Sequence, residues 1–229
     1  MKLSVLMPVH NEEGTVDEII ARVRAVDLGD VEKEIVVVDD ASNDATAARL
    51  EAYRGDPDVT VVTHPTNRGK GAAIRTALSR ATGDMVIIQD ADLEYDPGDY
   101  PRLIAPIVEG RADVVYGSRF AGSVDNMAFP HWLANKILAW TATILFFHRV
   151  TDEATCYKVL RTDLLRSFDL SCERFEFCPE VTAKTLRGGF RLVEVPISYH
   201  ARTIEAGKKI RWTDGLEAVW TLVKFRFKR

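Results

Sequence analysis

The chain has 229 residues, of which 46% are hydrophobic and 28% are charged, and its formal net charge is −4. This balance is typical of a globular protein, and it excludes a disordered chain, a collagen-like repeat and a disulfide scaffold. The charge is unevenly distributed, because residues 200–229 carry +5 and the preceding 199 residues carry −9. An acidic body with a basic tail indicates one part that handles cations and another that contacts anions or a membrane.

The first half of the chain alternates strand and helix patterns. We expect strands at residues 3–8, 34–40, 59–63, 84–90 and 114–118, and helices after Thr15, over 43–53 and over 70–81. Two of the runs are almost wholly apolar and end in aspartate, a pattern typical of strands that are buried on both faces of a parallel sheet. The alternation predicts an α/β domain with a mostly parallel sheet flanked by helices.

The second half is less regular. We expect an aromatic and aliphatic helix over residues 127–148, a strand over 192–199 and a closing amphipathic helix over 214–228. No repeat, low-complexity tract or linker marks a boundary, so we predict a single domain over residues 1–229 with a C-terminal amphipathic elaboration.

The cysteines and the apolar runs bear on the location of the protein. Cys156, Cys172 and Cys178 are odd in number and lack metal-ligand spacing, which favours free thiols in a reducing cytosol. The longest apolar stretch, residues 137–147, has eleven residues, whereas a spanning helix needs about 20. The N-terminal apolar run is too short for a signal peptide. We expect a cytoplasmic protein that does not cross a membrane by itself.

Acidic residues follow two of the expected strands. Asp90 and Asp92 are one residue apart, so their carboxylates point the same way and can hold a divalent cation that also takes diphosphate oxygens. A solvated acidic turn is the alternative. Asp39 and Asp40 end a second strand of the same sheet, and clustered carboxylates repel unless a cation or hydrogen-bond donors offset them. Glu94 lies two residues after Asp92, so its side chain would point the same way. It could reach the ion or lie on the surface.

Two loops could contact a nucleotide. A strand-end carboxylate such as Asp39 or Asp40 can accept hydrogen bonds from a ribose or a base, although Ser42 or Asn43 could also cap a helix there. Residues 67–73 place glycines before a helix N-terminus, as phosphate-binding loops do, but lack Walker spacing. The usual markers of P-loop ATPases, hydride transfer, zinc proteolysis and serine hydrolysis are missing from the sequence.

Several motifs in order resemble a known family. Those of the first half are similar to the signature of family 2 glycosyltransferases of the GT-A fold: residues 6–13, 37–42, 67–71 and 90–92. Later motifs resemble the polyprenyl-phosphate (dolichyl-phosphate) hexosyltransferase branch, which includes dolichyl-phosphate mannose synthases: residues 116–119, 151–152, 156–158, 175–180 and 194–199. The resemblance covers roughly residues 3–227.

The resemblance implies a nucleotide-sugar half, residues 1–120, and an acceptor half, residues 121–229. The donor would be a nucleotide-diphosphate sugar, GDP-mannose or UDP-glucose, and its binding residues would be Pro8, His10, Asn11, Glu12, Asp39, Asp40, Lys70 and Asp90. Asp90 and Asp92 would hold Mg²⁺ or Mn²⁺ with help from Glu94. Relatives often carry Gln at that last position, so the sequence departs from the pattern there.

The resemblance further implies an inverting transfer of a hexose to a polyprenyl or dolichyl phosphate. The acceptor phosphate would be gathered by Arg119, His131, Asn135, Arg202 and Lys208, and the catalytic residues would be Asp92, Arg119 and Arg202. A phosphate oxygen is already anionic near neutral pH, since its second pKa is about 6, and needs no general base. A saccharide hydroxyl would need one, such as Glu180, which could instead end a loop and cap a helix.

The lipid side of the chain leaves two interpretations open. The helix over residues 127–148 could lie at a membrane interface or in the core. One stripe of the last helix is apolar and could pack in the core or face lipid: Leu216, Val219, Trp220, Val223 and Phe227. With the basic residues at its end, this helix favours peripheral contact with the cytoplasmic membrane face. We expect no nucleic-acid partner.

Three other functions share features of this sequence. A family 2 glycosyltransferase of cell-envelope polysaccharide synthesis would act on a saccharide hydroxyl. A sugar-phosphate nucleotidyltransferase also uses strand-end carboxylates with a metal, but it would show a glycine-rich N-terminal loop. A non-catalytic sugar-nucleotide sensor would have no reason to keep Asp92 together with Arg119 and Arg202.

Overall fold

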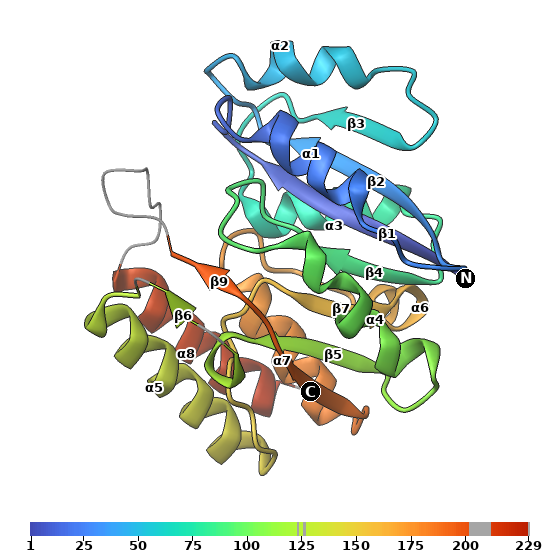
Figure 1. The fold of residues 1–229 in the computed structure, drawn as a ribbon. Coiled ribbons are helices and arrows are strands. Elements are labelled where there is room, and N and C mark those ends of the chain that lie inside the picture. Colours follow the sequence, from blue (N-terminus) through green and yellow to red (C-terminus); the bar gives the residue numbers. More distant parts are fainter. Residues whose placement is uncertain (123, 126, 202–211, 229) are drawn as a thin grey trace.

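A computed structural model of the chain describes residues 1–122, 124–125, 127–201 and 212–228. These residues form a seven-stranded sheet in the order β3-β2-β1-β4-β7-β5-β8 (Figure 1). Its strands are β1 (Lys2–Val9), β2 (Glu32–Asp39), β3 (Val59–Thr63), β4 (Met85–Ile88), β5 (Val114–Ser118), β7 (Lys158–Arg161) and β8 (Leu192–Pro196). A second, two-stranded sheet pairs β6 (Val124–Asp125) with β9 (Tyr199–His200).

The seven-stranded sheet confirms the expected mostly parallel arrangement, with one exception. β7 is antiparallel to both of its neighbours, β4 and β5. The strand is four residues long, and its sequence has neither the length nor the alternation that identifies a strand, so it was not expected. The strands expected at residues 59–63 and 114–118 coincide with β3 and β5.

Helices cover both faces of the sheet. They are α1 (Val16–Ala25), α2 (Thr46–Leu50), α3 (Lys70–Arg80), α4 (Tyr100–Val108), α5 (Phe129–Phe146), α6 (Thr162–Ser167), α7 (Phe177–Arg187) and α8 (Trp212–Phe227). α1 and α4 lie on one face, and α3 and α7 lie on the other (Figure 1). Thr15 stands at the start of α1 as expected, but its hydroxyl donates to the Glu12 carbonyl and carboxylate and does not cap the helix.

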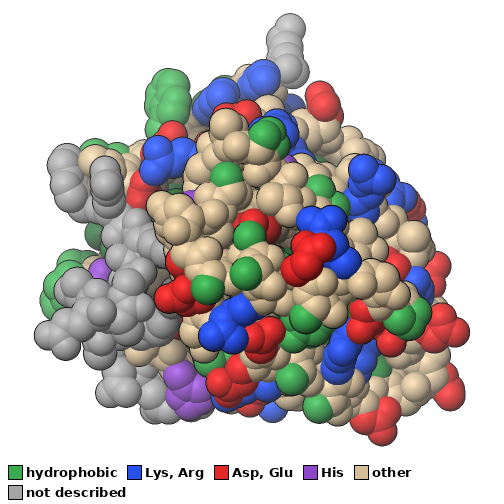
Figure 2. All heavy atoms as spheres, turned by 90° about the horizontal axis from the view of Figure 1, so that it is seen from above, with side chains coloured by type: hydrophobic (Ala, Val, Ile, Leu, Met, Phe, Trp, Pro, Cys, Tyr) green, Lys and Arg blue, Asp and Glu red, His purple; other side chains and the backbone are tan. Residues whose placement is uncertain are grey.

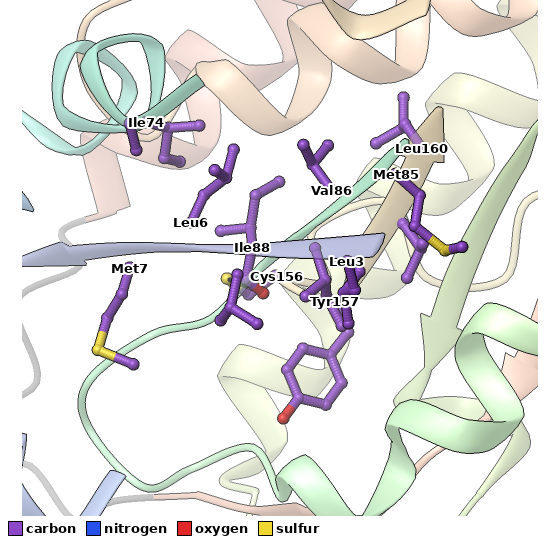
Figure 3. Packing of buried hydrophobic residues seen from close by; sticks show 14 of the residues in the cluster. Leu3, Leu6, Met7, Ile74, Met85, Val86, Ile88, Cys156, Tyr157 and Leu160 are labelled. Carbon is purple, nitrogen blue, oxygen red and sulfur yellow. Dashed lines mark hydrogen bonds between the residues drawn. The ribbon is translucent and has the colours of Figure 1, made fainter. Parts of the chain in front are cut away.

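The core lies on both sides of the central strands. Leu6 of β1 and Val86 of β4 point toward Ile74 of α3, and Tyr157 points to the opposite side, toward α4 (Figure 3). β4 is buried along its whole length and β1 along all but its first residue. Burial on both faces explains why β4 is apolar at every position and β1 at most positions, and it confirms the interpretation of residues 84–90 as a buried strand.

α5 and α8 pack against each other beside the sheet (Figure 1). α8 also packs against α7, and these helices share a small separate core that includes Ala142, Ala183, Leu222 and Phe225. None of the helices that the structure describes is both long and apolar enough to cross a bilayer.

Candidate functional site

The expected site residues of the first half gather at the carboxyl ends of β2, β1 and β4, three adjacent strands. Pro8 is buried in β1, and His10, Asn11 and Glu12 follow that strand in the turn before α1. Ligands of open α/β sheets bind at this edge. The sheet order therefore brings together three groups of residues that are far apart in the sequence.

The loops after β1 and β2 are joined by hydrogen bonds. The Asn11 backbone N–H donates to the Ser42 hydroxyl at 2.9 Å, and the Asn11 side-chain oxygen Oδ1 accepts from the Asn43 N–H at 2.9 Å. Asn11 has a φ of 53°, a left-handed conformation that asparagine tolerates better than most residues. The Glu12 N–H donates to the Thr46 hydroxyl. These bonds hold the two loops together, and Asn11, Ser42 and Asn43 form a rim at this edge of the sheet. Asn11 therefore has a positioning role in addition to any contact with a ligand.

Asp39 combines deep burial with an unused acceptor. Its side-chain Oδ1 accepts from the N–H of Ser42 at 3.0 Å and from the Ser42 hydroxyl at 2.5 Å. Its Oδ2 is buried and has no partner among the described residues. A buried carboxylate oxygen without a donor is unfavourable. A ligand that brings an N–H or O–H group to this position would remove that cost.

Asp40 is engaged by the protein itself. Its Oδ1 contacts His64 Nδ1 at 2.7 Å and accepts from the N–H of Arg68 at 2.9 Å, while its Oδ2 accepts from the N–H of Gly69 at 2.7 Å. The carboxylate therefore anchors the loop between β3 and α3. His10 Nδ1 lies 3.0 Å from the Asp40 carbonyl oxygen. That Asp40 also contacts the ribose stays a prediction, and the loop-anchoring role was not foreseen.

A buried glutamine supports the acidic turn after β4. Gln89 Oε1 accepts hydrogen bonds from the hydroxyls of Tyr100 and Tyr157, at 2.6 and 2.7 Å, and its amide nitrogen donates to the Asp90 carbonyl at 2.9 Å. All three side chains are fully or almost fully buried. Desolvation raises the pKa of both tyrosines well above the ordinary value, so they remain neutral donors. The network fixes the direction in which the chain leaves β4.

The acidic turn itself is held at two points. Leu93 has a φ of 62°, and the N–H of Glu94 donates to Asp92 Oδ1 at 3.2 Å. The Glu94 Oε2 accepts from the Tyr199 hydroxyl at 2.7 Å. Tyr199 also stacks edge-on against Tyr95, with ring centroids 5.1 Å apart. These tyrosines were not predicted as site residues. Tyr199 ends the motif of residues 194–199, but no role was assigned to it, because a Tyr by itself does not show whether it lies in a site or in the core.

Lys70 provides the positive charge nearest to Asp90 among the contacts described. It begins α3, and its Nζ lies 2.7 Å from Oδ1 and 2.9 Å from Oδ2 of Asp90. It also lies 3.4 Å from Cys156 Sγ. The charge repulsion expected among the strand-end carboxylates is thus offset here by a lysine.

The carboxylates after β4 suit a divalent cation. Among the described residues, no group of three or more His, Cys, Asp and Glu side chains converges as a metal site. A hard cation such as Mg²⁺ is commonly held by one or two carboxylates, with phosphate and water oxygens completing its shell. Asp90 and Asp92 fit that requirement. The contact of Glu94 with Tyr199 gives Glu94 an additional role, so its share in metal binding stays a prediction.

Arg119 lies in a buried ion pair. Its Nε and Nη2 both donate to the carboxylate of Asp152 at 2.7 Å, and its backbone N–H donates to the same carboxylate at 2.9 Å. The Glu194 carboxylate accepts from the N–H groups of Thr151 and Asp152. The bidentate contact with Asp152 fixes the plane of the Arg119 guanidinium. Asp152 and Glu194 lie in the motifs that carry the resemblance, but the sequence did not show that they support Arg119.

Two further acceptor candidates lie next to Arg119. Asn135 of α5 accepts from Arg119 Nη2 at 3.3 Å and donates to the His131 carbonyl oxygen at 2.8 Å. The structure thus brings Arg119 and Asn135 together, with His131 one helical turn away. The other two candidates, Arg202 and Lys208, lie outside the described residues.

Glu180 has a structural role. Its buried carboxylate accepts from the N–H groups of Ser171 and Cys172 and from the ammonium of Lys184, at 2.7–3.1 Å. Burial favours the neutral form, but these donors outweigh it and the pKa is lowered. The carboxylate ties the preceding loop to α7, but it does not cap the helix, whose N-cap position is Glu176.

α5 and α8 carry exposed apolar side chains. Among the described residues, the large hydrophobic side chains that are exposed belong to these helices or to the adjacent Phe147, apart from Met1 and Val108. They are Phe129, Trp132, Leu133, Ile137, Trp140, Ile144, Phe147, Leu216, Trp220 and Phe227. Trp140 is 59% exposed and Trp220 is 66% exposed. Of the two interpretations of the tail stripe, core packing is wrong for Leu216, Trp220 and Phe227.

A family model now accounts for the motifs. The model described as glycosyl transferase family 2 matches residues 4–168. The chain belongs to glycosyl transferase family 2. This membership confirms the resemblance and the expected enzyme class, and it does not support the nucleotidyltransferase alternative.

Two of the curated relatives are named as mannosyltransferases of dolichol phosphate or undecaprenyl phosphate. The chain is 29% identical over 206 residues to the dolichol-phosphate mannosyltransferase of Pyrococcus furiosus, which covers 88% of this chain and 57% of that protein. It is 31% identical over 221 residues to the undecaprenyl-phosphate mannosyltransferase of Micrococcus luteus, covering 91% and 87%. It is also 31% identical to the low-salt glycan biosynthesis hexosyltransferase Agl6 of Haloferax volcanii, covering 97% and 52%. The chain thus spans little more than half the length of the first and third of these relatives.

Solved structures share the fold. Glucosyl-3-phosphoglycerate synthase from Mycobacterium tuberculosis, crystallised with Mn²⁺, UDP and phosphoglyceric acid, superposes with a TM-score of 0.71 over 99% of this chain and 78% of that one, at 23% identity. Residues 1–349 of TarS from S. aureus with UDP-GlcNAc give a TM-score of 0.66 over 98% and 67%, at 22% identity. These likenesses confirm the expected GT-A fold.

Proposed function

We propose that this chain is an inverting, metal-dependent glycosyltransferase that moves a hexose, with mannose favoured over glucose, from a nucleotide-diphosphate sugar to a polyprenyl or dolichyl phosphate. The observation that carries the proposal is the convergence of Asp39, Asp90 and Asp92 at the ends of β2 and β4, which flank β1. Family membership supports the reaction class. The relatives named as mannosyltransferases of dolichol phosphate and undecaprenyl phosphate support the sugar and the acceptor class.

The donor base would meet Asp39. Its buried Oδ2 needs a donor, and both uracil and guanine present a ring N–H that can supply one. The rim of Asn11, Ser42 and Asn43 would hold the base and ribose in place. Pro8, His10, Glu12 and Asp40 would line the same end of the sheet, and Lys70 would lie near the diphosphate.

Asp90 and Asp92 would hold Mg²⁺ or Mn²⁺, which supplies Lewis-acid stabilisation to the diphosphate that leaves. A solved structural neighbour carries Mn²⁺ together with UDP, which supports a divalent cation here. The Gln89 network would keep the Asp90 main chain in one position, so the two carboxylates need not reorganise as the leaving group departs.

The acceptor phosphate would be positioned beside Arg119 and Asn135, with His131, Arg202 and Lys208 completing its site. Asp152 holds the guanidinium of Arg119 in one orientation, so its remaining N–H groups would meet the phosphate in a fixed direction. An anionic phosphate oxygen can attack the anomeric carbon without a base. Glu180 is engaged by the N–H groups of Ser171 and Cys172, the Ser171 hydroxyl and the Lys184 ammonium, which argues against its use as a base for a saccharide hydroxyl acceptor.

α5 and α8 would lie against a membrane. Exposed aromatic and aliphatic side chains on two neighbouring helices suit an interface that is apolar on one side. Lys224, Arg226 and Lys228 near the end of α8 would meet anionic headgroups. Such peripheral contact would place Asn135 of α5, and Arg119 next to it, close to a lipid-borne phosphate.

Transfer assays with matched acceptors test the proposal. The chain is incubated with GDP-mannose or UDP-glucose, Mn²⁺ or Mg²⁺, and either a short polyprenyl phosphate or the corresponding polyprenol. We expect a glycolipid product from the phosphate with GDP-mannose and none from the polyprenol, and EDTA should abolish it. Hydrolysis of the donor without a lipid product for every acceptor would contradict the acceptor class.

A further inference from the structure

The ion pair between Lys70 and Asp90 has a consequence for metal binding. Both side chains are largely buried, 18% and 20% exposed, and the ammonium contacts both carboxylate oxygens. The ammonium of Lys70 is therefore placed where the first carboxylate of the acidic turn would otherwise receive a metal ion.

Two cations cannot share this carboxylate at close range without repelling each other, and the repulsion is stronger in a partly buried site than in water. A divalent ion that uses Asp90 must therefore move the ammonium away or bind against its charge. In the free protein, Lys70 and the metal compete for the same two oxygen atoms.

A diphosphate would remove this competition. Lysine has a flexible four-carbon stem and three rotatable donors, so the ammonium can turn from a carboxylate to a nearby phosphate without losing an anionic partner. The same diphosphate brings oxygen ligands for a hard cation. Both changes favour the metal at the moment when the nucleotide binds.

We propose that Lys70 acts as an internal cation that occupies Asp90 in the nucleotide-free protein and yields this carboxylate to the metal when a nucleoside diphosphate binds. The inference rests on the proposed nucleotide-sugar site. It makes the binding of metal and nucleotide cooperative beyond their direct contact, and by linkage each ligand tightens the other by the same factor. The acidic turn is thereby neutralised in both states, first by lysine and then by metal.

Direct metal titration tests this role. Binding of Mn²⁺ is measured from the electron paramagnetic resonance signal of free Mn²⁺, for the unmodified chain and for Lys70→Met, without nucleotide and with saturating UDP or GDP. We expect Lys70→Met to bind Mn²⁺ about tenfold more tightly without nucleotide, because Asp90 is released. The increase in Mn²⁺ affinity that UDP or GDP causes should be smaller for Lys70→Met than for the unmodified chain, by a similar factor.

Three variants serve as controls. Lys70→Arg keeps a cation and should resemble the unmodified chain. Lys2→Met removes another lysine–carboxylate pair, with Glu34 at 2.7 Å, at the opposite end of β1 and should leave Mn²⁺ binding unchanged. In an Asp90→Asn background, Lys70→Met should have no effect on Mn²⁺ affinity. Lys70→Gln replaces Lys70→Met if circular dichroism shows that the latter is unfolded.

The outcomes separate this inference from the proposed function. If Lys70→Met and Lys70→Gln bind Mn²⁺ no more tightly than the unmodified chain without nucleotide, Lys70 does not compete and the inference is wrong, while nucleotide-dependent Mn²⁺ binding would still support metal-dependent transfer. If no variant binds Mn²⁺ with either nucleotide, both the inference and the metal-dependent mechanism are overturned.

Discussion

The surface around α1 and α2 differs from the surface of α5 and α8. Exposed charges on the first pair of helices and on the turn after α2 lie in ion pairs, such as Arg22 with Glu18, Arg49 with Asp17, and Arg54 with Glu51. From the side of α2 and β3, Figure 2 shows basic and acidic side chains next to one another at several places on this face. Such exposed pairs add little stability, and they keep this surface hydrated.

α5 and α8 instead expose tryptophan, phenylalanine, isoleucine and leucine. Both helices already bury another side: Leu138, Ala139 and Ala142 on α5, and Ala218, Leu222 and Phe225 on α8. Packing of the fold therefore does not explain the outer apolar residues. The difference shows that the surface of the proposed nucleotide half exposes paired charges, whereas the proposed acceptor half carries a surface that suits an apolar environment.

The largest effect that we expect is a loss of transfer activity when the donor site is altered. Asp92→Ala should reduce kcat/KM for hexose transfer to polyprenyl phosphate by roughly 10²–10³-fold, because one of the two carboxylates proposed to hold the divalent cation is lost. Transfer of labelled hexose to polyprenyl phosphate measures it. Asp30→Ala, at an exposed turn, is the matched control. Full activity of Asp92→Ala would contradict the metal-dependent mechanism.

The next largest effect concerns the base. Asp39→Asn keeps an oxygen for Ser42 but replaces the carboxylate that would accept from the base, so nucleotide affinity should fall by about 10- to 100-fold. Calorimetric titration with UDP and GDP measures the change and also ranks the two bases. Asp58→Asn, an exposed substitution, should leave affinity unchanged. Equal affinities for Asp39→Asn and the unmodified chain would separate Asp39 from nucleotide binding.

The apolar surface should respond independently of the donor site. Trp220→Glu should reduce binding to vesicles that contain anionic lipid by about 30-fold, since a buried aromatic side chain contributes about 2 kcal/mol. Cosedimentation measures this, and nucleotide affinity should not change. Val108→Glu places the same charge on an exposed apolar residue of α4 and should bind vesicles normally. If both variants lose vesicle binding equally, the effect is one of net charge.

The smallest effect concerns the scaffold of the nucleotide half. Glu34 accepts from Lys2, Ser4 and Thr82, and although burial opposes its charge, these donors lower its pKa to about 2. The stability it contributes is present above its unfolded pKa of 4.5 and is lost as the pH falls from there toward 2. Glu34→Gln should destabilise the fold by about 1 kcal/mol at pH 7.

Urea unfolding at pH 7, 4 and 3 measures the effect of Glu34→Gln, and the difference between the two proteins should shrink as the pH falls. Glu18→Gln, in an exposed pair on α1, provides the comparison and should change stability by a few tenths of a kcal/mol. A Glu34→Gln difference that is constant with pH would show that the ionised carboxylate does not contribute.

Much of the nucleotide half could be predicted from the sequence. Strands that are buried on both faces are apolar throughout, so β2 and β4 were recognisable, and the carboxyl ends of parallel strands must meet at one edge. Asp39, Asp90 and Asp92 could therefore be grouped without knowing the strand order. The side-chain partners of these carboxylates could not be predicted, because Asp40 with His64 and Asp90 with Lys70 join segments whose distance depends on loop conformation.

The acceptor half was less predictable. β7 is too short to show a pattern, and its place between β4 and β5 follows from pairing with both neighbours. An amphipathic pattern identified α8, but an aromatic stripe has the same pattern whether it faces the core or the outside.

By itself, the sequence determined the α/β class, the family and the acidic residues at the sheet edge, because periodicity and motif order are local properties of the chain. The tertiary structure decided which charges meet and which apolar faces stay exposed. Lys70 lies against Asp90, Arg119 against Asp152, and Trp220 points away from the core. The physical reason is that burial and ion pairing depend on neighbours brought together by folding, and no single segment contains that information.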